Sequence, residues 1–178
     1  MKKSSTYNLV IASFCLALTQ ILPLLTGQIP QLGNMLAPMH IPVLLCGFLC
    51  SPVYALLVGF TAPILRFLLF SMPPIMPIGM AMSFELATYG LIASVLYKKY
   101  GIYISLVISM ISGRIVWGIV MSIIAGVSSV PFGISAFIMG AFVMAIPAII
   151  LQVILVPLLV NVIKGRVDKY ETNKSSKS

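Results

Sequence analysis

The stretch GMAMSFELATYGLIASVLYKK, Gly79–Lys99, holds an apolar run that is long enough to cross a lipid bilayer as one helix. It nevertheless carries a carboxylate, Glu85, and it ends at the basic pair Lys98 and Lys99. An acidic side chain at membrane depth is costly and normally faces a cavity or a group of opposite charge. The positions of the other charges in the chain therefore decide what Glu85 does.

The rest of the chain is as apolar as this stretch. Of its 178 residues, 60% are hydrophobic and 8% are charged, whereas about a quarter of the residues in a soluble domain are charged. The composition predicts an all-α integral membrane protein of the cell membrane. The net charge of +8 comes from basic residues beside apolar runs. Because they form no basic stripe on a polar domain, we do not expect nucleic-acid binding.

Prolines and glycines divide the chain into six apolar segments. These run over Asn8–Thr26, His40–Cys50, Val53–Phe70, Ile78–Tyr97, Ile102–Ala125 and Ala136–Ile163. The second segment is too short to span a bilayer alone unless it is tilted or begins near Leu32. Pro147 and Pro157 predict a kink or tilt in the last one. We expect a compact bundle of six transmembrane helices over residues 1–163 and a basic, disordered tail over residues 164–178.

The positive-inside rule orients this bundle. Six spans place both chain termini on one side of the membrane. On that side lie Lys2, Lys3, Lys98, Lys99, Lys164, Arg166, Lys169, Lys174 and Lys177. The connections on the other side, residues 27–39, 71–77 and 126–135, carry no Lys or Arg. Both termini are therefore expected in the cytoplasm.

Four ionisable side chains remain at membrane depth or its edge: Arg66, Arg114, Glu85 and His40. In the expected topology they converge on the outer half of the bundle. Two arginines against one glutamate leave one positive charge unbalanced. We expect Glu85 to pair with one arginine, so that the other binds an anionic ligand through its guanidinium. Two alternatives stay open: Arg66 snorkels to the outer headgroups, or Glu85 and Arg114 form a purely structural pair.

Polar and aromatic residues near these charges add candidates for ligand binding. Gln31 and Asn34 lie in a proline-containing outer connection, where stiff backbone lowers the entropy cost of closing over a site. Tyr89 follows Glu85 by one helical turn, and Trp117 follows Arg114 by three residues. Both aromatic side chains are equally consistent with packing. Gln152, a polar residue within the last segment, is a weaker candidate.

The sequence argues against an enzyme. It contains no H-E-x-x-H or G-x-S-x-G motif and no Walker motif, and it has a single histidine. We therefore predict no catalytic residues, no metal site and no cofactor. A small secondary transporter and a structural subunit remain open, although six segments without an evident repeat are unusual for a secondary transporter.

The motifs PMHIPVLLCG and MPPIMP…FELATYG, within Leu36–Leu91, resemble the S components of energy-coupling factor (ECF) transporters, in a subgroup with pantothenate-type and riboflavin-type members. The resemblance extends from the first segment to the sixth. The AxxxA pattern of the family's first helix appears here as Ser13 and Ala17, with serine in the first place. Small residues at this spacing allow another helix to approach closely.

The resemblance implies a function. An S component captures a vitamin from outside and docks on a transmembrane coupling protein with two cytoplasmic ATPases, where ATP hydrolysis topples it to deliver the vitamin inward. Residues 1–163 would then form the substrate-binding domain, with Ser13 and Ala17 facing the coupling protein. The unbalanced positive charge favours pantothenate, which has one carboxylate. Riboflavin, a queuosine precursor and a pyrimidine or pterin compound remain open.

Overall fold

The computed structural model describes residues 4–25, 36–128 and 133–175, and the regular elements in these ranges are all helices. In the described chain, four stretches are long and apolar enough to cross a membrane. They are Ser5–Leu25, Pro52–Phe70, Ile75–Val127 and Ile146–Arg166. The predicted class, an all-helical membrane protein, is confirmed.

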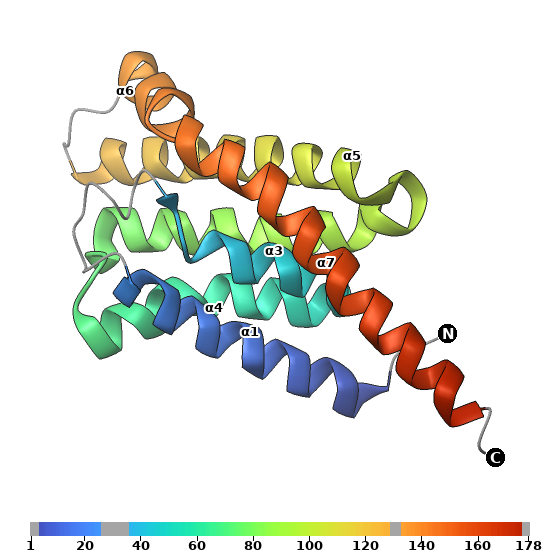
Figure 1. Ribbon diagram of the computed structural model, residues 1–178. Coiled ribbons are helices and arrows are strands. Elements are labelled where there is room, and N and C mark those ends of the chain that lie inside the picture. Colours follow the sequence, from blue (N-terminus) through green and yellow to red (C-terminus); the bar gives the residue numbers. More distant parts are fainter. Residues whose placement is uncertain (1–3, 26–35, 129–132, 176–178) are drawn as a thin grey trace.

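The longest element, α5 (Met80–Ser128), consists of two helices. Gly101 interrupts it with φ 75° and ψ −175°, a conformation that glycine adopts without steric strain. Figure 1 shows the chain reversing direction at this point, so that the two halves of α5 run antiparallel. The two halves correspond to the predicted fourth and fifth segments, and Lys98 and Lys99 lie just before the reversal.

Helix α3 (His40–Leu49) lies at the centre of the molecule, and all ten of its residues are buried. It packs against α1 (Ser5–Leu25), α4 (Pro52–Phe70), α5 and α7 (Ile146–Ser175), as Figure 1 also shows. A helix that is apolar all round can be buried on every side. Pro52 starts a new helix after a connection of two residues, because the residue before a proline is disfavoured in helical conformation. The predicted second segment is thus a short central helix.

The predicted sixth segment is divided into three elements. These are α6 (Ile134–Ile138), the π-helical turn η2 (Met139–Val143) and α7. The break precedes Pro147, whose ring is incompatible with the helical carbonyl four residues earlier. Helix α7 then continues to Ser175. The predicted division between the bundle and its tail at Lys164 stays a prediction, and α7 extends across this position.

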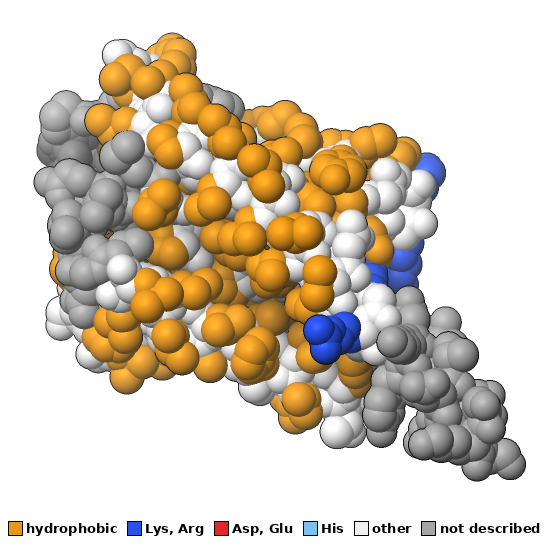
Figure 2. All heavy atoms as spheres, in the orientation of Figure 1, with side chains coloured by type: hydrophobic (Ala, Val, Ile, Leu, Met, Phe, Trp, Pro, Cys, Tyr) orange, Lys and Arg blue, Asp and Glu red, His pale blue; other side chains and the backbone are white. Residues whose placement is uncertain are grey.

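The two ends of the bundle differ in charge. The start of α1, the reversal at Gly101 and the end of α7 lie at one end, and the π-helical turn η1 (Ile75–Gly79) and α6 lie at the other (Figure 1). On the face drawn in Figure 2, Lys and Arg side chains gather at the first of these ends, and apolar side chains cover the region between. There the ammonium group of Lys164 lies 3.7 Å from the centre of the Tyr97 ring, joining α7 to α5.

The first half of α5 packs closely against α4. A Cβ atom on Gly59 would overlap the main chain of Leu86, and one on Gly90 would overlap the main-chain oxygen of Ala55. Glycines at a helix crossing allow backbones to approach, which strengthens packing in lipid. This contact holds the α5 residues between Leu86 and Gly90 firmly in the interior.

Candidate functional site

Three polar side chains surround Glu85 in the interior. The Tyr89 hydroxyl donates a hydrogen bond of 2.9 Å to Glu85 Oε1. Arg114 Nε lies 3.4 Å from the same oxygen, and His40 Nε2 lies 3.7 Å from it. The Glu85 side chain is only 2% exposed. The sequence-predicted residues His40, Glu85, Tyr89 and Arg114 are therefore brought together from α3 and from both halves of α5.

The reversal at Gly101 places this cluster. Glu85 precedes the glycine by 16 residues and Arg114 follows it by 13, so both side chains lie at a similar distance from the turn, about 20–24 Å at 1.5 Å per residue. Glu85 and Tyr89 share one helix face because they are four residues apart. The ring of Tyr89 packs directly on Gly113, where any side chain would collide with it.

The Glu85–Arg114 pair resolves which arginine neutralises the acid. It forms a net-neutral ion pair in a medium of low dielectric, where each charge depends on the other. The pair does not complete the hydrogen bonding of the cluster. Within the described structure, Arg114 Nε and His40 Nδ1 are buried and have no hydrogen-bond partner.

Arg66 lies apart from this cluster, on α4. Its Nη1 donates a hydrogen bond of 2.9 Å to the main-chain oxygen of Gln20 on α1, and its guanidinium carbon lies 5.0 Å from the centre of the Phe70 ring. The residue is 5% exposed. Glu85 is the one acid whose side chain the structure describes, and its ion partners are Arg114 and His40. Among the described residues, Arg66 thus has no carboxylate partner.

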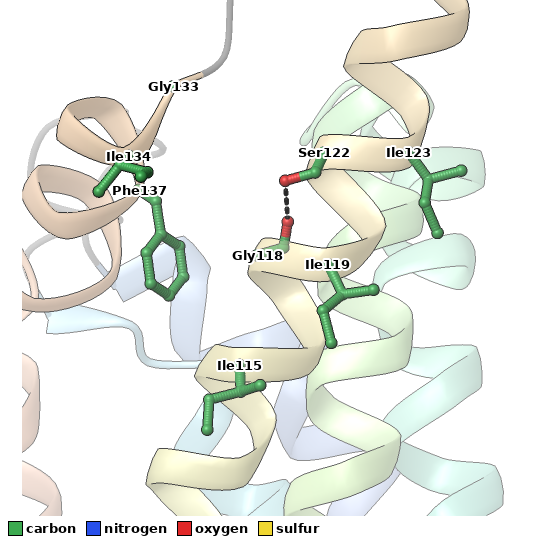
Figure 3. A pocket seen from close by; sticks show the side chains of 8 residues that line it. All are labelled: Ile115, Gly118, Ile119, Ser122, Ile123, Gly133, Ile134 and Phe137. Atoms are coloured by element: carbon green, nitrogen blue, oxygen red, sulfur yellow. Dashed lines mark hydrogen bonds between the residues drawn. The ribbon is translucent and has the colours of Figure 1, made fainter.

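Trp117 stacks on Phe137 of α6, with ring centres 6.3 Å apart. Phe137 lines an apolar groove of about 560 Å³ between α6 and the second half of α5 (Figure 3). None of the sequence-predicted ligand residues within the described chain lines this groove. The Ser122 hydroxyl, which lines the groove, donates a hydrogen bond of 2.8 Å to the Gly118 carbonyl. Gln31 and Asn34 lie outside the described residues.

Residues 7–160 match the family described as ECF transporter, substrate-specific component. The chain belongs to this family. It is an S component of an ECF transporter, a multi-pass protein of the cell membrane that binds a micronutrient and is not an enzyme. The match spans the helices that carry both arginines and Glu85. Searches of curated proteins and of solved structures returned no match.

Ser13 and Ala17 of this S component are both exposed on the outer surface of α1. They alternate there with large exposed side chains, among them Val10, Phe14 and Ile21. Ser13 and Ala17 therefore form a strip of small side chains on the surface of the bundle and do not pack inside it. An S component works with the other subunits of the ECF module, and this strip is accessible to one of them.

Two glutamine side chains of the S component, Gln20 and Gln152, are buried inside apolar helices. Gln20 supplies the carbonyl that holds Arg66, and its side-chain nitrogen donates to the Ala62 carbonyl at 3.2 Å. Gln152 is completely buried in α7. The signal in the sequence was the same for both: an amide side chain inside an otherwise apolar helix, where lipid cannot satisfy it.

Proposed function

We propose that this S component binds pantothenate from the outer side of the membrane. The observation that carries the proposal is Arg66, a buried guanidinium without a carboxylate partner among the described residues. A guanidinium binds a carboxylate through two parallel hydrogen bonds, and such charge-assisted bonds are strong. Pantothenate has one carboxylate, one amide and two hydroxyl groups. The resemblance to the pantothenate-type and riboflavin-type subgroup supports the same choice.

The polar cluster provides partners for the uncharged part of the ligand. We assign the carboxylate of pantothenate to Arg66 and its hydroxyl and amide groups to the donors and acceptors around Glu85, which are Arg114, His40 and Tyr89. Arg114 Nε and His40 Nδ1 support this assignment because both are buried without a hydrogen-bond partner. Gln31, Asn34 and Trp117 remain proposed as ligand-binding residues.

The balanced charge of the Glu85–Arg114 pair also favours a second candidate. A cluster without net charge suits an uncharged ligand, and riboflavin belongs to the same subgroup by resemblance. Arg66 would then be a structural cation held by Gln20 and Phe70. A queuosine precursor and a pyrimidine or pterin compound fit this second reading equally.

The proposed topology has six spans with both termini in the cytoplasm. The two halves of α5 form two spans, and α3 forms a short one beside α1, α4 and α7. The end of the bundle with Lys98, Lys99, Lys164 and Arg166 then faces the cytoplasm, in agreement with the positive-inside rule. His40 and the end of α4 near Arg66 lie toward the opposite, outer end.

The first test is the identity of the bound molecule. Purified protein is expected to bind pantothenate and to discriminate by at least tenfold against pantothenol, in which an alcohol replaces the carboxylate. Isothermal titration calorimetry measures both affinities, and native mass spectrometry of freshly purified protein identifies any molecule that copurifies. Equal affinity for the two compounds would contradict the role of Arg66, and copurified riboflavin would favour the second candidate.

We further propose that the strip at Ser13 and Ala17 contacts the transmembrane coupling protein, which carries two cytoplasmic ATPases and drives toppling of the S component. Ser13→Trp or Ala17→Trp is expected to leave pantothenate binding unchanged and to reduce ATP-dependent uptake by cells at least tenfold. A bulky side chain prevents the close helix contact that small residues allow. Leu158→Trp, at an exposed position of α7, serves as the control. Normal uptake by both α1 variants would refute this assignment.

A further inference from the structure

Gln152 is exceptional among the buried polar side chains that the structure describes. It is 0% exposed, and neither its Oε1 nor its Nε2 has a hydrogen-bond partner. Other buried polar side chains reach the main chain of the connection between α3 and α4: Asn8 Oδ1 accepts from the Ser51 amide at 2.8 Å, and the Ser94 hydroxyl donates to the Cys50 carbonyl at 2.9 Å. In the described structure, no other buried side-chain amide lacks partners at both of its polar atoms.

An unpaired amide in this position is costly. A buried donor or acceptor without a partner destabilises the protein, and in the bilayer interior no bulk water is present to replace the missing bonds. Methionine has nearly the same shape as glutamine and would avoid this cost. A bound molecule that offers one acceptor and one donor would satisfy both atoms at once.

The position of Gln152 connects it to the polar cluster. Helix α7 packs on α3 and α5, the two helices that carry His40, Glu85 and Arg114. Gln152 lies six residues into α7, about 9 Å from its outer end at 1.5 Å per residue, and α3 begins with His40 at that same end (Figure 1).

A buried stripe runs along α7 through Gln152. It consists of Ala148, Gln152, Val156 and Val160 on the helix and of Ala145 just before it, each at most 2% exposed. On the outer side of the glutamine the stripe consists of the two alanines, which are apolar. The residues toward the cytoplasm are larger and belong to the apolar core. Gln152 is therefore the innermost polar group on this stripe.

We propose that Gln152 is a specificity-determining residue of the ligand site. Its Nε2 donates to a carbonyl oxygen of the ligand, and its Oε1 accepts from a neighbouring N–H or O–H group. The ligand must present a donor and an acceptor side by side. In pantothenate these are the amide carbonyl and the adjacent hydroxyl, and in riboflavin they are a ring carbonyl and the adjacent imide N–H. This inference rests on the proposed function as an S component site but not on the choice of vitamin.

The test compares Gln152→Met with wild-type protein in two measurements. Titration with pantothenate is expected to show at least a tenfold loss of affinity for Gln152→Met. Thermal unfolding of the ligand-free protein in detergent is expected to show an equal or higher melting temperature, because an unpaired buried amide has been removed. Leu151→Met, at a half-buried apolar position next to it, is the matched control and should retain affinity. Unchanged affinity in Gln152→Met, or a lower melting temperature that accompanies weaker binding, would overturn the proposal.

A ligand variant makes the test specific to these two hydrogen bonds. Pantothenate that lacks the hydroxyl next to the amide carbonyl should bind wild-type protein more weakly, but the same deletion should cost Gln152→Met little or nothing. Equal losses in both proteins would contradict the pairing. If wild-type protein binds riboflavin instead, the pantothenate proposal fails, and a tenfold loss of riboflavin affinity in Gln152→Met would still support the inference.

Discussion

Replacing Glu85 alone with leucine is expected to destabilise the ligand-free protein by about 3–5 kcal/mol, because it leaves the Arg114 guanidinium buried without a counter-charge. Arg114→Leu should have an effect of similar size, since it leaves the carboxylate with only the Tyr89 hydroxyl and His40. The free energy of unfolding can be measured by titrating detergent-solubilised protein with sodium dodecyl sulfate. This is the largest stability effect that we expect from a single substitution in the cluster.

The double variant Glu85→Leu/Arg114→Leu decides whether the loss comes from the unpaired charge. Replacement of a whole buried ion pair by apolar residues is often close to neutral, so the double variant should recover most of the stability that either single variant loses. Thr88→Val is the control on the same helix, because its hydroxyl is exposed and bonds only to the Phe84 carbonyl within α5. Additive losses in the double variant would show that Glu85 and Arg114 do not act as a pair.

Replacing Arg66 with methionine is expected to lower the affinity for pantothenate by about 10- to 150-fold, the equivalent of the 1.5–3 kcal/mol that a hydrogen bond to a charged group contributes. Methionine retains much of the apolar contact with Phe70 and removes the charge. Arg66→Lys keeps the charge but loses the planar guanidinium, which can form two parallel hydrogen bonds. The affinity of Arg66→Lys for pantothenate should therefore lie between those of wild-type protein and Arg66→Met. Calorimetric titration of the three proteins under one salt concentration measures the series.

Pantothenol provides the matched control for this series. Since it has no carboxylate, its affinity should be nearly the same for wild-type protein and for Arg66→Met. The preference for pantothenate over pantothenol should therefore disappear in the variant. If Arg66→Met weakens the binding of both compounds equally, the guanidinium has a structural role through Gln20 and not a role in binding the carboxylate.

The helical segments were largely predictable because membrane insertion imposes simple rules. A long apolar run must form its own hydrogen bonds and is therefore helical, and proline and glycine mark where it ends. The predicted segment from His40 and the one from Val53 agree with α3 and α4 within one residue at each end. The boundary predicted at Lys164 stays a prediction, since α7 begins before this position and ends after it.

The sequence predicted which residues form the candidate site, but it did not predict which arginine pairs with Glu85. An ionisable residue inside an apolar segment is conspicuous, so His40, Arg66, Glu85 and Arg114 could be selected directly. Which arginine meets Glu85 depends on the reversal at Gly101 and on the rotation of each half of α5. No local pattern encodes that rotation.

The sequence by itself determined the solvent of this protein, the number of its apolar segments and the charge that remains unbalanced among them, because these follow from composition and order along the chain. Only the tertiary structure decided that Arg114 neutralises Glu85 and that, among the residues it describes, Arg66 is held by α1 without an acid and Gln152 is buried without a partner. The physical reason is distance: the energy of a buried charge or amide depends on which groups lie within a few ångströms, and those groups come from helices that are far apart in the sequence.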